Sequence, residues 1–213
     1  MNWMIWIFVP VLYGVFSLWY FNWQGPLSSE EIDRIMATFT ELEGSKQTDA
    51  AVFRKFLEAD DGGEFVMLNQ VHLHDGKVAH PLTGKPTNAS DILQGYFGPF
   101  ALALFKRGGH PVFQATTVGG NVDSWNADAN VGFGTTAMMR YKSRRDLVEL
   151  VLDPAFSDGH IYKLAAIERT VSYPTKVMLS TSLRPPIAVL LLLILLASLA
   201  QNLSFLFLSL IHI

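Results

Sequence analysis

Two long apolar stretches without a charged side chain, one near each end, constrain the architecture of this chain more than any other feature. No Asp, Glu, Lys or Arg precedes Glu30, and none follows Arg184. Trp and Tyr residues crowd both ends of the first stretch, and leucine dominates the second. A helix needs about 20 apolar residues to cross a bilayer core, and aromatic residues collect at the two interfaces. The sequence therefore predicts an integral membrane protein with two transmembrane helices, over residues 1–24 and 185–213.

The charged residues lie in a central block of roughly 150 residues, the length of one ordinary domain. The net charge is −3 and there is no cysteine. A nucleic-acid partner is not expected, because it needs a basic surface, and thiolate chemistry is excluded. Lys176 and Arg184 flank the second apolar stretch on the domain side, so the positive-inside rule favours a cytoplasmic domain. The basic run at residues 140–145 is predicted to be a solvated helix start, with contact to anionic headgroups as the alternative.

Periodicity divides the central block into a helical linker over residues 25–63 and a domain over residues 64–176. In the linker, Ser28 or Ser29 followed by Glu31 predicts a helix N-terminus. In the domain, we expect strands over 64–74, 111–118, 131–141 and 167–173, and a polar loop over 81–90. We expect one helix over 92–107, a second from Ser143 that is broken by Asp153-Pro154, and a further helical piece to about residue 166. This order of elements predicts an α+β fold, a ferredoxin-like βαββαβ domain with a four-stranded antiparallel sheet and both helices on one face.

Four segments of this domain match a known pattern. They are Met67-Leu68-Asn69 with His74-Asp75, the turn at 108–112, the run at 137–147 with Asp153-Pro154-Ala155-Phe156, and the run at 160–170. Together they resemble the dimeric α/β-barrel superfamily, in an uncharacterised domain-of-unknown-function branch related to antibiotic-biosynthesis-type monooxygenases. The resemblance implies a homodimer through the sheet face. It also implies relatives that include cofactor-independent monooxygenases, lactone isomerases and haem-binding enzymes, so the fold alone does not fix the activity.

Polar residues on the first strand of the domain are the leading site candidates. His72 and His74 are two residues apart on a strand, so they point to one face, and Gln70 shares that face while Asn69 lies on the other. We expect Gln70, His72 and His74 to bind a ligand through hydrogen bonds, or else to form a polar patch in a dimer interface. With His80 nearby, the histidines are also weak candidates for a metal site, although no metal is expected.

Three residues elsewhere in the domain complete the candidates. His110 follows two glycines and precedes a strand, so it joins His72 as a candidate general base. Trp125 resembles a family position near the rim of the pocket, where it would contact a ligand. His160 could bind haem in a distant relative, but the local pattern is not that of the haem branch, so no cofactor is expected.

Two functions are consistent with these features. The first is a membrane-anchored α/β-barrel domain that binds a small apolar ligand or serves as an accessory subunit of a membrane complex. The alternative is a membrane-bound, cofactor-independent monooxygenase or isomerase that acts on a hydrophobic small molecule. The expected partners are membrane lipid and either a second copy of the chain or other membrane subunits.

Overall fold

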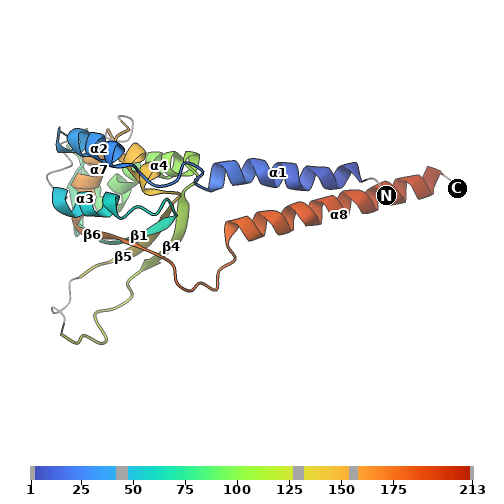
Figure 1. The fold of residues 1–213 in the computed structure, drawn as a ribbon. Helices are drawn as coiled ribbons and strands as arrows, with labels where there is room; N and C mark the ends of the chain where they lie inside the picture. Colours follow the sequence, from blue (N-terminus) through green and yellow to red (C-terminus); the bar gives the residue numbers. More distant parts are fainter. Residues whose placement is uncertain (1–2, 42–47, 127–131, 154–157, 212–213) are drawn as a thin grey trace. The chain divides into compact units, whose positions relative to one another are not determined.

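The protein divides into two compact units in the computed structural model, which describes residues 3–41, 48–126, 132–153 and 158–211. One unit comprises Met1–Trp23 with Val177–Ile213, and the other comprises Gln24–Lys176 (Figure 1). The first is a helical unit, and the second is an α+β unit. The predicted strand residue at 131 and the motif residues at 154–156 lie outside the described residues.

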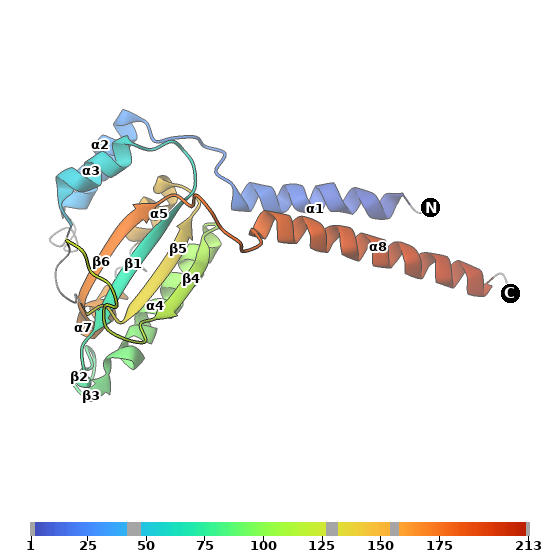
Figure 2. The ribbon, with the colours of Figure 1, turned by 90° about the horizontal axis from the view of Figure 1, so that it is seen from below.

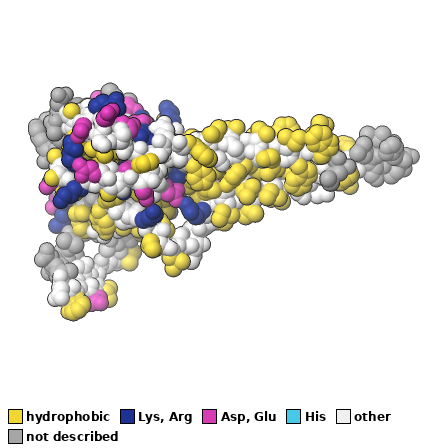
Figure 3. Space-filling model, viewed as in Figure 1, with side chains coloured by type: hydrophobic (Ala, Val, Ile, Leu, Met, Phe, Trp, Pro, Cys, Tyr) yellow, Lys and Arg dark blue, Asp and Glu magenta, His cyan; other side chains and the backbone are white. Residues whose placement is uncertain are grey.

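The helical unit consists of α1 (Met4–Tyr20) and α8 (Pro185–Ile211), which lie side by side. Hydrophobic side chains cover both helices, whereas charged side chains gather on the α+β unit (Figure 3). Among the described residues, one helix is long and apolar enough to cross a membrane by length and composition. It is the 23-residue stretch Pro185–Phe207 of α8. The membrane prediction for the second apolar stretch is thus consistent with the structure.

The structure does not support a second membrane span in the first apolar stretch. Helix α1 has 17 residues, which at 1.5 Å per residue is about 25 Å, less than the ~30 Å of a bilayer core. It ends because Phe21 adopts an extended conformation, with φ −96° and ψ 152°. Trp23 then folds back and donates from Nε1 to the carbonyl oxygen of Ser17 at 3.0 Å. The aromatic residues after Tyr20 therefore end the helix instead of extending it.

The α+β unit is built on a four-stranded antiparallel sheet with the strand order β4-β5-β1-β6. The strands are β1 (Phe65–Leu73), β4 (His110–Thr116), β5 (Thr135–Tyr141) and β6 (Ile167–Thr175). Helices α4 (Ala89–Lys106), α5 (Arg144–Val151) and α7 (His160–Ala166) lie on one face of it (Figure 2). This arrangement confirms the predicted mixed α+β domain. The hairpin of β2 (Lys77–Ala79) and β3 (Pro86–Asn88) was not predicted, and β3 falls within the expected polar loop.

Strand β1 lies at the centre of the sheet and divides its residues between two faces. Met67, Asn69 and Val71 pair with Met139, Ala137 and Thr135 of β5, and Leu68 and Gln70 pair with Met138 and Thr136. Successive residues of a strand point to opposite faces. The face of Met67, Asn69 and Val71 is packed under the helices and is called the covered face. The face of Leu68, Gln70 and His72 is called the outer face.

Helices α2 (Ser29–Glu41) and α3 (Ala50–Glu58) pack on α5 through a second apolar cluster. This cluster contains Ile32, Met36, Phe39, Leu57 and Val148. Helix α2 begins with a reciprocal capping box, in which the Ser28 N–H donates to Glu31 at 2.8 Å and the Glu31 N–H donates to Ser28 at 3.2 Å. The Ser28 N–H lowers the pKa of the Glu31 carboxyl. Of the two predicted caps, Ser28 is the one used.

The basic run at residues 140–145 is not simply a solvated helix start. Arg140 is only 4% exposed, pairs with Glu64 at 2.7 Å and donates to the carbonyl oxygen of Gly108 at 2.6 Å. Arg145 pairs with Glu31 of α2 at 3.0 Å. The prediction is wrong for Arg140, because acidic residues from preceding segments fold back onto the run.

Candidate functional site

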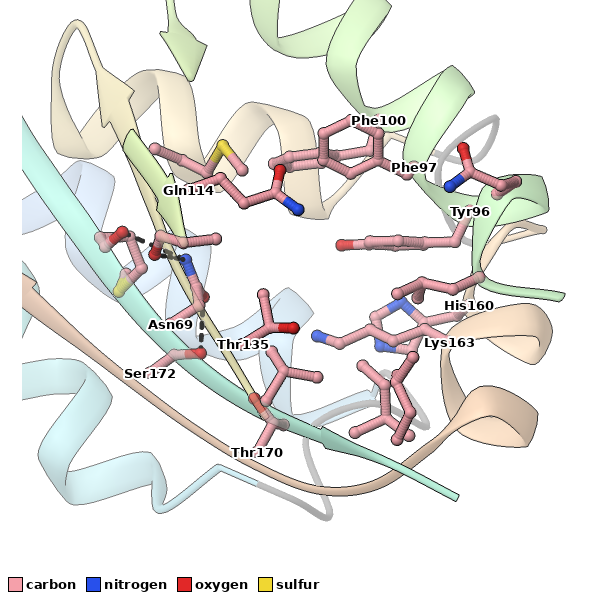
Figure 4. Close-up of a pocket in the computed structure, with 18 of the residues that line it drawn as sticks. Asn69, Tyr96, Phe97, Phe100, Gln114, Thr135, His160, Lys163, Thr170 and Ser172 are labelled. Atoms are coloured by element: carbon pink, nitrogen blue, oxygen red, sulfur yellow. Dashed lines mark hydrogen bonds between the residues drawn. The ribbon is translucent and has the colours of Figure 1, made fainter. Parts of the chain in front are cut away.

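A cavity of about 420 Å³ lies between the covered face of the sheet and helices α4, α5 and α7 (Figure 4). This volume falls within the ~300–1,000 Å³ that is typical of small-molecule sites. The strands contribute one wall through alternate residues, and the helices contribute the opposite wall. The lining residues on which the argument depends are Asn69, Tyr96, Phe97, Phe100, Gln114, Thr135, Ala137, Met139, Leu150, His160, Lys163, Thr170 and Ser172. A partly open cavity is thus formed by the ordinary packing of helices on one face of a sheet.

Most of the cavity wall is apolar. Phe100 and Leu150 are 7% and 1% exposed, respectively, and belong to the main hydrophobic core together with Met139. The Tyr96 ring stacks on Phe100, with ring centroids 5.5 Å apart and an interplanar angle of 10°. Phe97 packs beside them. Contact of such a surface with apolar atoms in place of water is favourable.

Polar groups on the strand side of the cavity are held by bonds within the protein. Asn69 donates from Nδ2 to the carbonyl oxygens of Met67 and Ala137 at 3.1 and 3.4 Å. Its Oδ1 accepts from the Ser172 hydroxyl at 2.7 Å (Figure 4). The Thr170 hydroxyl donates to the Gln70 carbonyl oxygen at 3.0 Å. These hydrogen bonds fix the floor of the cavity in one arrangement.

Helix α7 places two basic side chains in the cavity. His160 and Lys163 are three residues apart, so they share a face of this short helix. Both approach Tyr96 of α4: Lys163 Nζ lies 5.6 Å from the centroid of the phenol ring, and the His160 ring stands edge-on to it at 6.2 Å. A basic group, a hydroxyl and an imidazole therefore share one end of an apolar cavity.

The apolar surroundings shift the protonation equilibria of these groups. Burial lowers the pKa of the Lys163 ammonium. Burial, and then the charge of Lys163, lower the pKa of His160 below its ordinary 6.5. Burial raises the pKa of the Tyr96 hydroxyl. At neutral pH, Tyr96 therefore remains a hydrogen-bond donor and His160 is a neutral imidazole that can accept a proton.

Two of the predicted ligand-binding residues come together, but on the outer face. Gln70 and His72 line a groove with Thr136 and with a loop that follows β4. The loop residues in this groove are Thr117, Gly119, Gly120, Asn121, Gly132, Phe133 and Gly134. His72 Nε2 lies 3.4 Å from a carboxylate oxygen of Glu168. The assignment of Gln70 and His72 as ligand-binding stays a prediction, in a separate place from the cavity.

Of the three histidines proposed as weak metal candidates, His72 and His80 make local contacts through their rings, and His74 is held through its backbone. The His74 backbone N–H donates to the Ala166 carbonyl oxygen at 3.1 Å, just after β1 ends. His80 Nδ1 accepts from the Leu82 backbone N–H at 3.2 Å. Within the described part of the chain, no group of three His, Cys, Asp or Glu side chains is placed to hold a metal ion.

The remaining candidates, Trp125 and His110, lie outside both the cavity lining and the outer groove. Trp125 is 85% exposed in the loop that follows β4. His110 begins β4, and its Nδ1 lies 2.9 Å from the carbonyl oxygen of Pro111. A catalytic role for His110 and a ligand contact for Trp125 stay predictions.

Sequence reasoning did not single out Tyr96 or Lys163, and it considered His160 only as a haem ligand. One signal was present: His160 and Lys163 are spaced by three residues, and they are the two basic residues of a short helix with the sequence HIYKLAA. A second signal was Asn69, a polar residue that alternation places on the same face of the strand as Met67 and Val71. Neither signal shows that an open volume lies between them, because that volume depends on how the helices pack.

Comparison with known proteins shows similarity of fold alone. No model of a known protein family matches the chain, and no curated protein matches it. A crystal structure of methylated RPA0582 protein matches with 23% identity and a TM-score of 0.50, over 62% of this chain and 93% of that one. A second structure of RPA0582, a protein of unknown function from Rhodopseudomonas palustris, matches with 22% identity and a TM-score of 0.49, over 61% and 94%. At3g17210 from Arabidopsis thaliana matches with 16% identity and a TM-score of 0.35, over 56% and 99%.

Proposed function

We propose that the chain is a membrane-anchored protein whose α+β unit binds a small, largely apolar molecule. The observation that carries this proposal is the cavity of about 420 Å³ between the covered face and the helices. Its aromatic and aliphatic wall favours an apolar body, and the few polar groups at the α7 end would orient it.

The test is native mass spectrometry of the full-length chain in lipid nanodiscs, with analysis of released small molecules. Ala137→Phe places a ring inside the cavity, whereas Thr136→Phe places the same ring one residue away on the outer face. We expect a defined small molecule to accompany the native chain and Thr136→Phe, and to be lost from Ala137→Phe. Retention by Ala137→Phe and loss from Thr136→Phe would instead place the ligand in the outer groove and overturn this assignment.

We also propose that the unit is a ferredoxin-like domain that pairs with a second copy through the outer face, as in a dimeric α/β barrel. The support is apolar exposure: Phe113, Val171 and Tyr173 are 50%, 48% and 43% exposed. Phe113 pairs in register with Met138, Tyr173 with Leu68, and Val171 with Gln70, so they share one face. Val171→Lys should give a monomer in nanodiscs where the native chain is a dimer. A native monomer, or recovery only with other membrane proteins, would favour an accessory subunit.

Membrane anchoring through α8 is part of the proposal, with α1 packed along it as a second membrane segment and the domain in the cytoplasm. Because the chain has no cysteine, Val122→Cys in the exposed loop provides one thiol for labelling. A membrane-impermeant maleimide should label it only after the cells are lysed. Labelling of intact cells would place the domain outside. Leu195→Arg in α8 should release the protein from membranes, and Ile7→Arg in α1 should weaken its retention less.

Catalysis without a cofactor, of the monooxygenase or isomerase kind, is a second candidate. It is favoured by His160, whose lowered pKa leaves a neutral imidazole beside Tyr96. A base in that place could remove a proton from carbon next to a carbonyl group. The measurement is deuterium exchange at that carbon in a hydrophobic ketone, followed by NMR. Equal exchange rates with the native chain and with His160→Gln would rule out this role for His160.

A further inference from the structure

Lys163 brings a cationic group into an apolar cavity that contains no described acidic residue. Of the described residues that line the cavity, none is Asp or Glu. None of the described carboxylates forms an ion pair with Lys163, whose Nζ lies 5.6 Å from the centroid of the Tyr96 ring. Withdrawal of an ammonium group from water is costly unless a counter-charge or hydrogen-bond acceptors replace the water. Within the described part of the chain, the cavity therefore has no negative group that would balance this side chain.

We propose that the ligand supplies this group: it is an amphipathic carboxylic acid, whose apolar body fills the cavity and whose carboxylate pairs with Lys163. This inference rests on the proposed ligand-binding function and names the chemical class of the ligand. Lys163, the Tyr96 hydroxyl and the Thr135 hydroxyl are directed into the same space, so they can donate to one carboxylate (Figure 4). Hydrogen bonds from charged or hydroxyl donors to an ionised carboxylate are among the stronger ones in proteins.

Other ligand classes fit this end of the cavity less well. A cationic ligand would be repelled by Lys163, and a purely apolar one would leave the ammonium group unpaired. The apolar wall of Phe97, Phe100 and Leu150 equally excludes a ligand that is charged throughout. Fatty acids and aryl-substituted acids share the required chemistry, a single carboxylate on an apolar body.

The test compares two probes that differ only at their polar end, 4-phenylbutanoate and 4-phenylbutan-1-ol. Calorimetric titration into the full-length chain in nanodiscs, with empty nanodiscs subtracted, gives both affinities for the native chain, Lys163→Met and Ala137→Phe. We expect the native chain to bind the acid about tenfold or more tightly than the alcohol, as loss of a partly buried charge pair implies. Lys163→Met should lower the affinity for the acid to the level of the affinity for the alcohol. The affinity for the alcohol should not change. Ala137→Phe should weaken both.

The outcomes separate this inference from the proposed function. Equal affinities of the native chain for acid and alcohol, both lost in Ala137→Phe, would overturn the acid specificity and keep the ligand-binding cavity. Binding that Ala137→Phe leaves intact, or no binding of either probe, would overturn both. Thermal unfolding of Lys163→Met provides the folding control, because removal of a partly buried charge that has no acidic partner among the described residues should not lower the midpoint.

A pH series gives an independent readout. Among the described residues, the titratable groups that line the cavity with Lys163 are Tyr96 of α4 and His160 of α7, near it, and Tyr141 at the other end of β5. Burial lowers the pKa of Lys163 from its ordinary 10.5, so rising pH removes the ammonium charge before it would in water. Affinity for the acid should therefore fall as pH rises towards the ordinary lysine pKa, while affinity for the alcohol stays level. Parallel behaviour of the two probes would contradict the ion pair.

Discussion

The same four strands form both faces of the sheet, but the two faces have different surroundings. On β1, Met67, Asn69 and Val71 line the cavity, and their neighbours Gln70 and His72 line the outer groove. On the covered face, helices α4, α5 and α7 form one wall of a partly open cavity, and burial there shifts the pKa values of Tyr96, His160 and Lys163. The outer face has the more suggestive residue types, but its groove is walled on one side by a loop. The apolar wall of the cavity, rather than the number of histidines, distinguishes the covered face, because the outer groove is of similar volume but is lined mostly by polar residues and glycines.

Adjacent methionines on β5 give the largest expected contrast between the faces. Met139 is 5% exposed in the main core, whereas Met138 is only partly buried on the outer face. Met139→Ala should lower the free energy of unfolding by about 2–4 kcal/mol, and Met138→Ala by less than about 1 kcal/mol, because a cavity forms only in the packed core. Chemical denaturation followed by near-UV circular dichroism measures both.

The outcome of that pair also bears on the proposed dimer. If a second copy covers the outer face, the Met138→Ala cost should grow as protein concentration rises, since dissociation then contributes to unfolding. Similar losses of stability in the two variants at every protein concentration would show that the two faces are packed alike.

Arg140 is an exception to the difference in packing between the two faces, because its register places it on the outer face and yet its side chain is buried. Pairing with Val66 puts it on that face, and Glu64 at 2.7 Å compensates its charge. Glu64→Ala should cost about 1–2 kcal/mol, less than for a fully buried pair, because the carboxylate is 35% exposed. Arg140→Met should restore part of the loss in the Glu64→Ala background, and failure to do so would show that the pair contributes little.

Neighbouring amides on β1 give a smaller contrast. Asn69 makes three hydrogen bonds on the covered face, to Met67, Ala137 and Ser172. Asn69→Ala should therefore cost about 1–2 kcal/mol, whereas Gln70→Ala should change stability by less than about 0.5 kcal/mol. Thermal unfolding of the two variants decides this, and a larger loss for Gln70→Ala would give the outer groove a structural role.

Local signals in the sequence were enough for the elements of the α+β unit. The alternation over 64–74 predicted β1 at Phe65–Leu73, and the Ser28 and Glu31 pair predicted the start of α2. These signals are short-range, because they depend on side-chain periodicity or on caps a few residues apart. The hairpin of β2 and β3 lacked such a signal, since each strand has three residues and is mostly exposed.

The features that sequence reasoning missed depend on residues far apart in the chain. Arg140 is buried because Glu64, 76 residues earlier, reaches it. The cavity needs Tyr96 from α4 and Lys163 from α7 to meet over β1. Residue type pointed instead to the histidines on the outer face, because histidine is the commoner sign of chemistry. Which face carries an apolar cavity depends on helix packing, and that is not encoded in any single segment.

The smallest expected effect tests whether the covered face alone imposes a pH dependence on stability. Burial and Lys163 lower the pKa of His160 below 6.5, its value in an unfolded chain. The unfolded state then binds more protons over the window between the lowered value and about 6.5, so stability should fall as pH falls through it. His160→Gln should remove this slope. Lys163→Met should shrink it only in part, because burial is the larger cause and remains. Unfolding midpoints measured across that pH window test this prediction. An unchanged slope of stability against pH in His160→Gln would mean that the dependence arises from other groups, which include those on the outer face.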